Sequence, residues 1–263
     1  LLLEPSRTNS VPNSEYILGY SLSASTTITQ NYGISPEGVQ NSARIQFSGL
    51  GYIAFGVTTY TNEVSSMYVK GTAGEILNFG KGGNVAQGAL YTFTGDWQRI
   101  VYDVGSTSST FIISNYSGAN ATDFEVYGLQ HEQGSYPTSY IPTYGVSQTR
   151  SGDISTASLN ASSTGSFYVS LGKVQDPYFI VLGEEFTANS TRNDIAVAYS
   201  PTELRISLNG AIVVSATGTY DTSSLTSVQL GHYNGADQLG EGVKELNMFN
   251  AFLTDTELNA LTV

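Results

Sequence analysis

The sequence has no cysteine, few charges and few basic residues, and each shortage excludes a class of protein. Without cysteine there are no disulfides, thiolate nucleophiles or cysteine-ligated zinc sites. Lys and Arg number 10 against 22 Asp and Glu, a formal net charge of −12. Nucleic acid is therefore an unfavourable partner, because proteins bind its phosphates by replacing counterions with basic side chains. The sequence also lacks the run of about 18 apolar residues that a membrane-spanning helix needs, so we expect no membrane insertion.

The residues that are abundant are those of β-structure. The chain has 28 Gly, 18 Tyr and 11 Phe, and its polarity comes mainly from Ser, Thr, Asn and Gln because only 12% of residues are charged. Aromatic and β-branched side chains pack well on a pleated sheet, while Gly and Asn form tight turns. Alternating runs separated by turn residues are typical of a sandwich or jelly roll. In the first half they predict strands at 43–47, 52–57, 64–70, 97–104, 110–113 and 124–129.

The length of 263 residues fits two domains of the usual size, about 100–150 residues each. Pro137 and Pro142 interrupt any strand pairing, and the stretch from there to Asp153 is polar, which indicates a boundary near residue 150. We therefore predict an all-β protein with two β-sandwich (jelly-roll) domains in tandem, at 1–150 and 151–263. A short C-terminal helix completes the predicted fold.

Two local patterns in the second half are specific. Leu204, Ile206 and Leu208 alternate on one face, and Asn209-Gly210 follows them with the residues of a type I′ turn, which predicts a hairpin. Near the end, Thr254 and Glu257 have the spacing of a capping box, which predicts a short helix that starts after Thr254.

Two segments resemble the beginning and end of a domain found in bacteriophage tail, fibre and other virion proteins. The beginning is Leu-Leu-Glu-Pro-Ser-Arg-Thr-Asn at 2–9 with Asn-Ser-Glu at 13–15. The end runs from Gly-Leu-Gln-His-Glu-Gln-Gly-Ser at 128–135 through Tyr-Pro-Thr-Ser-Tyr-Ile-Pro-Thr at 136–143 to Thr149-Arg150, and Gly-Asp-Trp-Gln-Arg-Ile at 95–100 is similar to the central strand of that domain. The resemblance implies a jelly roll like those of carbohydrate-binding modules. His131 departs from the pattern, where a leucine is expected.

The second half resembles the concanavalin A-like and laminin-G-like lectin sandwiches. The similarity lies in the hairpin at 204–214, in Val-Gln-Leu-Gly at 228–231 and in the closing stretch 243–254. Such sandwiches bind sugars, bind proteins or hydrolyse glycans, so this resemblance implies a fold more than a function.

Together the two resemblances imply a non-enzymatic component of a phage virion surface or fibre. Its expected partners are a host cell-surface glycan, neighbouring virion proteins, or both. Its expected location is the exterior of the virus particle, on tail fibre or as capsid decoration, and the resemblance implies a homo-oligomer, with a trimer as one form. A purely structural decoration or fibre protein is the first alternative, and a polysaccharide depolymerase is the second.

The sequence offers little support for catalysis. It has no Gly-x-Ser-x-Gly motif, and neither histidine stands in a recognisable nucleophile pattern. Glu184 and Glu185 are adjacent, so on a strand they point to opposite faces and cannot flank one glycosidic bond. Asp123 and Glu125 share a strand face, but without a third partner we interpret them as a solvated surface. No catalytic residue is predicted.

Sugar binding needs aromatic rings that stack on a pyranose and polar groups that take its hydroxyls. We interpret Trp97 as a packing residue because of its place beside Ile100. The better candidates are aromatic and polar residues in or near turns, with ordinary surface turns as the alternative interpretation. These candidates are Tyr32, Tyr52 and Tyr60 in the first domain and His232, Tyr233, Asn234 and Asp237 in the second.

No cofactor is required by any pattern in the sequence, but a structural calcium ion is a candidate. Calcium binds six to eight oxygen ligands, and carboxylates in Gly-rich loops supply them. The candidate ligands are Asp176, Glu184, Asp194 and Glu241, together with Asp237. No EF-hand pattern supports the site, and two histidines without cysteine do not make a zinc site.

Overall fold

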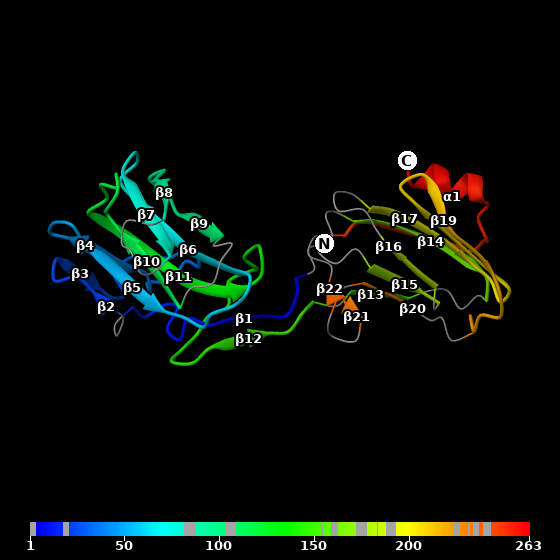
Figure 1. Cartoon of the computed structure of the whole chain (residues 1–263), viewed down its shortest axis with the longest axis horizontal. Helices are drawn as coiled ribbons and strands as arrows, with labels where there is room; N and C mark the ends of the chain where they lie inside the picture. The colour runs from blue at the N-terminus through cyan, green and yellow to red at the C-terminus, as the bar shows by residue number, and fades with distance from the viewer. Residues whose placement is uncertain are drawn as a thin grey trace. The chain divides into compact units, whose positions relative to one another are not determined.

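The computed structural model places most of the chain in two compact β-units. It describes residues 4–17, 21–81, 88–103, 109–153, 155–158, 163–171, 178–182, 184–187, 193–223, 227–230, 232–233, 237–238 and 243–263. One unit is Arg7–Arg150, here called the first sandwich (Figure 1). The other is Ser151–Val263 with Leu1–Ser6, here called the second sandwich. Within the second, the Asp153 N–H donates to Glu4 O (2.8 Å) and the Glu4 N–H donates to Asp153 Oδ2 (3.0 Å). The residues just before Arg7 therefore belong with the second unit, whereas the sequence had placed them in a domain at 1–150.

The first sandwich has two five-stranded antiparallel sheets, as expected for an all-β jelly roll. The strand orders are β2-β5-β10-β7-β8 and β3-β4-β11-β6-β9. The strands of the former are β2 (Ser21–Leu22), β5 (Tyr52–Gly56), β10 (Thr110–Ser114), β7 (Ile76–Lys81) and β8 (Ala89–Thr92). Those of the latter are β3 (Thr26–Thr29), β4 (Ala43–Phe47), β11 (Asp123–Gln133), β6 (Glu63–Gly71) and β9 (Gln98–Asp103). All six strands predicted for this half are present, most within a residue or two of the predicted ends.

Aromatic side chains fill the space between these sheets. The Phe55 and Phe111 rings stack with centroids 4.8 Å apart, and Phe79 meets Phe111 edge-on at 5.6 Å. Phe124 packs against Phe47 at 5.6 Å. All five rings are buried, so each contributes a large apolar area to the core.

The two ends of the first sandwich pair with each other. Strand β1 (Arg7–Asn9) lies antiparallel to β12 (Gln148–Arg150), with Arg7 opposite Arg150 and Asn9 opposite Gln148. The unit is therefore closed by its own first and last strands.

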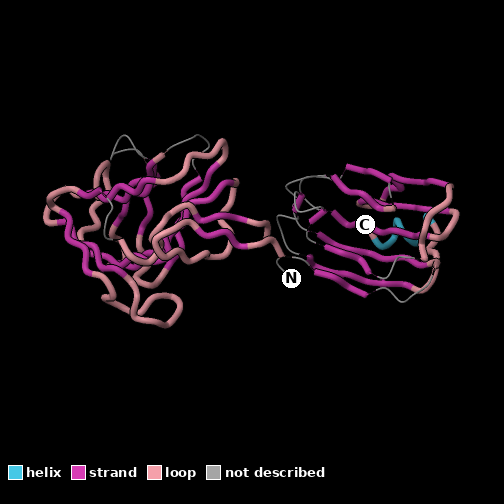
Figure 2. Tube along the Cα trace, turned by 90° about the horizontal axis from the view of Figure 1, so that it is seen from below, coloured by secondary structure: helices cyan, strands magenta, loops and turns pink. Residues whose placement is uncertain are grey.

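The second sandwich is built on one five-stranded sheet and three two-stranded pairs, and Figure 2 shows the predominance of strands in the described chain. The large sheet has the order β19-β18-β17-β14-β23. Its strands are β14 (Gly165–Leu171), β17 (Asn193–Tyr199), β18 (Glu203–Leu208), β19 (Ala211–Thr217) and β23 (Val243–Phe249). The pairs are β13 (Ser155–Ser158) with β20 (Ser227–Leu230), β15 (Tyr178–Val181) with β16 (Glu184–Thr187), and β21 (His232–Tyr233) with β22 (Asp237–Gln238).

The predicted hairpin and capping box are both confirmed. Strands β18 and β19 pair across Asn209 and Gly210, whose φ angles of 49° and 86° are the positive values of a type I′ turn. Helix α1 (Asp255–Leu261) starts after Thr254, whose side chain accepts from the Glu257 N–H while the Glu257 carboxylate accepts from the Thr254 N–H. Both signals are local, so the sequence was sufficient to predict them.

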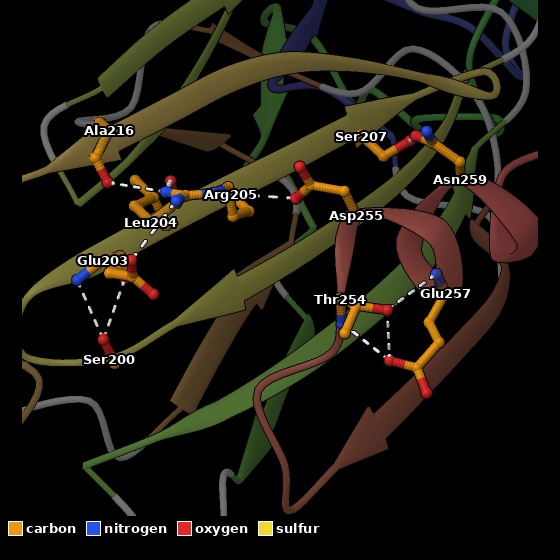
Figure 3. Close-up of polar contacts among 10 residues, drawn as sticks. All are labelled: Ser200, Glu203, Leu204, Arg205, Ser207, Ala216, Thr254, Asp255, Glu257 and Asn259. Carbon is orange, nitrogen blue, oxygen red and sulfur yellow. Dashed lines mark hydrogen bonds and ion pairs between the residues drawn. The ribbon is translucent and has the colours of Figure 1, made fainter.

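Polar contacts join this hairpin to the helix (Figure 3). The Arg205 guanidinium donates to Ala216 O (3.1 Å) and lies 3.7 Å from Asp255 Oδ1. Ser207 Oγ donates to Asn259 Oδ1 (2.7 Å). Buried Leu258 packs on the sheet beneath, so α1 covers one face of the large sheet while the main apolar cluster covers the other.

Candidate functional site

The outer face of the sheet β3-β4-β11-β6-β9 carries a group of polar and aromatic side chains. On β11, Phe124 and Val126 are buried in the core. Because side chains alternate along a strand, Asp123, Glu125 and Tyr127 point to the opposite, outer face. The shared face of Asp123 and Glu125 was predicted, and each of these carboxylates has a partner inside the protein.

Asp123 forms an ion pair with Arg44 on the neighbouring strand. Arg44 Nε donates to Asp123 Oδ1 (2.7 Å), the Arg44 Nη2 group contacts the other oxygen, and Gln46 Nε2 donates to it as well (3.2 Å). The hydrogen bond from Arg44 lowers the pKa of Asp123. The Arg44 guanidinium also lies over the Tyr32 ring, 4.9 Å from its centroid, which is a cation–π contact. Asp123 is thus held as a neutralised ion pair.

The segment between β3 and β4 folds across this face and covers Glu125. Ser42 Oγ donates to Glu125 Oε2 (2.6 Å), and a Cβ on Gly33 would lie 2.1 Å from the same oxygen, so the backbone approaches closely there. Further along the segment, Ile34 O accepts from Trp97 Nε1 (2.9 Å). The half-buried Trp97 therefore anchors the segment, which agrees with the predicted packing role.

Beside this segment lies a group of side chains that we call the Glu15 cluster: Glu15, Asn41, Tyr127, Tyr140 and Tyr144. The Glu15 carboxylate accepts from three tyrosine hydroxyls, those of Tyr127 (3.3 Å), Tyr140 (3.3 Å) and Tyr144 (3.2 Å). Its other oxygen accepts from Asn41 Nδ2 (3.2 Å). Asn41 Oδ1 is buried and has no hydrogen-bond partner among the described residues. Side chains from three segments, namely the segment before β4, strand β11 and the stretch between β11 and β12, thus converge on one carboxylate.

The tyrosines of the cluster act as neutral donors. Burial, followed by a hydrogen bond to Glu37, raises the pKa of Tyr127. Burial, followed by the charge of Glu15, raises the pKa of Tyr144, to which Glu37 also contributes. Burial raises the pKa of Tyr140, with Glu15 adding to it. Two carboxylates, Glu15 and Glu37, therefore act on the same hydroxyls.

The cluster is open to solvent on its outer side. The Tyr144 ring is 72% exposed although its hydroxyl is bound, and nearby in sequence Tyr16 is 48% exposed. Tyr127 is buried at the base and packs edge-on against Tyr140 with centroids 5.3 Å apart. An exposed aromatic side chain such as Tyr144, held in place beside carboxylate and amide groups, has the chemistry that sugar recognition uses.

The three tyrosines predicted as ligand residues in the first domain lie apart from one another in the structure. Tyr32 lies beside the outer face described above, under Arg44. Tyr52 lies on β5 of the other sheet, where its neighbour Ile53 points into the core. Tyr60 packs on the buried His131 ring, with centroids 5.8 Å apart. The three side chains thus lie at three different places on the sandwich.

The candidates of the second domain lie largely outside what the structure describes. His232 and Asp237 belong to the small pair β21 and β22, with Tyr233 opposite Asp237, but only their backbone is described. Asn234 lies outside the described residues. Binding by this loop stays a prediction.

The calcium candidates are not gathered into one site by the part of the chain that is described. Asp176 and Glu241 lie outside it. Glu184 is on β16, where its carboxylate accepts from Tyr220 OH (3.4 Å), and Asp194 is on β17 rather than in a loop. No group of three or more His, Cys, Asp or Glu side chains with metal-binding geometry occurs among the described residues.

A serine, a histidine and a glutamate meet inside the first sandwich. Ser65 Oγ lies 2.8 Å from His131 Nδ1, and Glu63 Oε2 lies 3.6 Å from His131 Nε2, which also lies 3.1 Å from Thr58 O. These are the residue types of a hydrolytic triad, and no pattern in the sequence indicates that they meet. Ser65, Glu63 and His131 are all at most 1% exposed, so the hydroxyl is out of reach of a substrate. Burial lowers the pKa of His131, with Glu63 opposing. The histidine that replaces the expected leucine is thus accommodated by polar partners.

The segments that carry the resemblance to virion domains form a second buried group, here called the closing network: Asn9, Gln130, Glu132 and Thr138. Asn9 Nδ2 donates to Leu129 O (3.0 Å) and to another main-chain carbonyl in the 136–143 stretch (2.8 Å). Glu132 Oε2 accepts from Gln130 Nε2 (2.6 Å) and the Thr138 N–H (3.0 Å), and Thr138 Oγ1 donates to its other oxygen. These bonds fasten the turn-rich stretch after β11 to the start of the first sandwich.

Comparison with known proteins adds no relative. No protein-family model matches the chain, and no curated protein sequence is significantly similar to it. Among the residues that the structure describes, no helix has the length and apolarity needed to cross a membrane.

Proposed function

We propose that this protein is a non-enzymatic component of a bacteriophage virion surface or tail fibre, and that it binds a host-cell glycan through the Glu15 cluster. The observation that carries the proposal is the Glu15 carboxylate, which three tyrosine hydroxyls hold at the solvent-facing side of a β-sandwich. Exposed rings beside fixed hydrogen-bonding groups suit the apolar face and the hydroxyls of a sugar.

Three further features support binding over chemistry. The resemblance at 2–15 and 128–150 implies a virion protein with a carbohydrate-binding-module-like jelly roll. Asp123, one of the two acids that share a strand face, is neutralised by Arg44, and Glu125 lies under the segment that contains Gly33. A glycosidase needs two acids that face a common sugar, and this pair does not offer them.

A glycan array probed with the full chain tests the proposal. We expect bound glycans whose signal falls by about tenfold in Tyr144→Ala, because a stacking ring contributes on the order of 1–2 kcal/mol. Tyr52→Ala, on the other sheet, is the matched control and leaves the signal unchanged. Tyr233→Ala tests the loop predicted in the second sandwich, and loss of signal there alone moves the binding site to that unit.

An array without any bound glycan contradicts the proposal. The chain is then better explained as a purely structural decoration or fibre protein, whose partners are other virion subunits. Release of shorter oligosaccharides from a bound polysaccharide contradicts it in another way, because that result identifies a depolymerase.

A further inference from the structure

The first sandwich places its own cations on several tyrosine rings. Arg44 lies over Tyr32 at 4.9 Å, and Arg99 lies over Tyr68 at 5.6 Å, measured to the ring centroid. Such contacts are favourable because the ring face is negative. Two tyrosines of this sheet face thus each have an arginine over the ring.

The Glu15 cluster has the same rings and more negative charge, yet no cation. Among the described residues, neither Glu15 nor Glu37 forms an ion pair with a lysine or an arginine, and no arginine lies over Tyr127, Tyr140 or Tyr144. Both carboxylates nevertheless act on the tyrosine hydroxyls, and both shift the pKa of Tyr127 and of Tyr144 in the same direction. Glu15 and Glu37 thus have no cationic partner among the described residues.

The surrounding groups are matched to an N–H donor with a positive charge. Three tyrosine hydroxyls fix the Glu15 carboxylate, and the exposed Glu37 acts on two of the same hydroxyls. Asn41 Oδ1 is an acceptor without a donor among the described residues. The exposed Tyr144 ring adds an aromatic face at the rim. Carboxylates and aromatic faces together are the groups by which proteins recognise ammonium ions.

We propose that the Glu15 cluster is a site for an ammonium group, and that the glycan of the proposed function is one that contains free amino sugars. This inference rests on the proposed function and specifies its ligand. The chain as a whole favours such a ligand, because a net charge of −12 attracts a polycation and repels acidic polysaccharides.

The test compares two probes with the same sugar backbone: a β-1,4-linked glucosamine hexamer, which carries ammonium groups, and its fully N-acetylated counterpart, in which neutral acetamides replace them. Calorimetric titration of the full chain at mildly acidic pH and low salt is expected to give at least about tenfold tighter binding of the glucosamine hexamer. Raising the salt concentration weakens that binding, because screening reduces the attraction between exposed charges.

Three variants test whether the glucosamine hexamer binds at the Glu15 cluster. Glu37→Gln removes an exposed charge and is expected to weaken binding of the glucosamine hexamer by about fivefold or more without affecting folding. Glu15→Gln keeps an oxygen acceptor for the tyrosine hydroxyls but removes the charge, and it is expected to weaken binding of the glucosamine hexamer further. Glu185→Gln removes an exposed carboxylate on β16 of the second sandwich, and it controls for the change in net charge.

The outcomes separate this inference from the proposed function. Equal affinity for the two hexamers, or equal loss in Glu37→Gln and Glu185→Gln, overturns the ammonium site. If an array at the same time shows binding of neutral or acidic glycans that is lost in Tyr144→Ala, glycan binding stands and only its ligand class is wrong. Absence of binding to every glycan overturns both.

Discussion

The closing network and the Glu15 cluster both draw on the start of the first sandwich and on the stretch from β11 onwards, with Asn41 added in the cluster, yet they differ in burial. Glu132 is fully buried, and its oxygens accept from a main-chain N–H, an amide and a hydroxyl. Glu15 is half-buried, and its oxygens accept from tyrosine hydroxyls and one amide. Donors around a fully buried carboxylate replace lost water and determine stability. Donors around a half-exposed one fix its direction while leaving it accessible, so the two sites should respond differently to substitution.

The largest effect on stability is expected for Asn9→Ala in the closing network. The Asn9 side chain donates to two main-chain carbonyls and accepts from the N–H groups of Val11 and His131, and alanine leaves all four partners buried and unpaired. We expect a loss of about 3–5 kcal/mol in the free energy of unfolding.

Urea denaturation followed by Trp97 fluorescence measures this loss, because the chain has one tryptophan and it lies in the first sandwich. The control is Asn62→Ala, an exposed asparagine in the same unit, with an expected change within about 0.5 kcal/mol. Similar values for the two variants would show that the network does not hold the unit closed.

An effect of intermediate size on stability is expected when the pH is lowered, because of His131, which lies next to the closing network. Because burial lowers its pKa, the unfolded chain binds a proton more readily than the folded one as the pH falls. The stability contributed by the neutral ring is therefore complete above the ordinary histidine pKa and is lost as the pH falls through it towards the lower folded value. We expect the first sandwich to lose about 1–2 kcal/mol between about pH 7 and pH 5 on this account.

The measurement is the difference between the wild-type protein and His131→Gln in urea denaturation at both pH values, again followed by Trp97. The difference cancels the titration of carboxylates that both proteins share. A pH dependence that persists unchanged in His131→Gln would assign it to another group.

The smallest effect is expected for Tyr144→Phe at the edge of the Glu15 cluster. Its ring is 72% exposed, and only one hydroxyl bond is lost. The change in unfolding free energy should stay below about 0.5 kcal/mol. A loss comparable to that of Asn9→Ala would mean that the cluster is part of the folding core, and the contrast between the two sites would no longer hold.

Local signals in the sequence were sufficient for much of the fold. The turn at Asn209-Gly210 requires residues that tolerate positive φ, and the cap at Thr254 requires an acceptor followed by Glu257, so both could be predicted from a few neighbours. Six strands of the first half were predicted from alternation for the same reason, whereas β1, β2, β3, β7, β8 and β12 were not predicted. Such elements, following one another along the chain, indicate the fold class.

The candidate site could not be predicted in this way. Glu15 and Tyr144 are 129 positions apart, and the tyrosines that meet at the carboxylate stand on a strand and in irregular stretches without any shared period. The tyrosines predicted to bind a ligand were chosen because they lie near turns, but turns occur at both sheets. Tyr52 and Tyr60 therefore lie at places on the sandwich away from the Glu15 cluster. Only the pairing of β1 with β12 and the course of the segment before β4 bring the cluster together.

The pairing of β1 with β12 also determines how the first sandwich responds to mechanical tension. Since the chain enters and leaves the unit through two adjacent antiparallel strands, a pull on the flanking segments reaches this strand pair before it reaches either large sheet. Such a load peels the pair apart one bond after another instead of shearing many bonds at once. The aromatic core between the two large sheets therefore bears no load until β1 and β12 have separated.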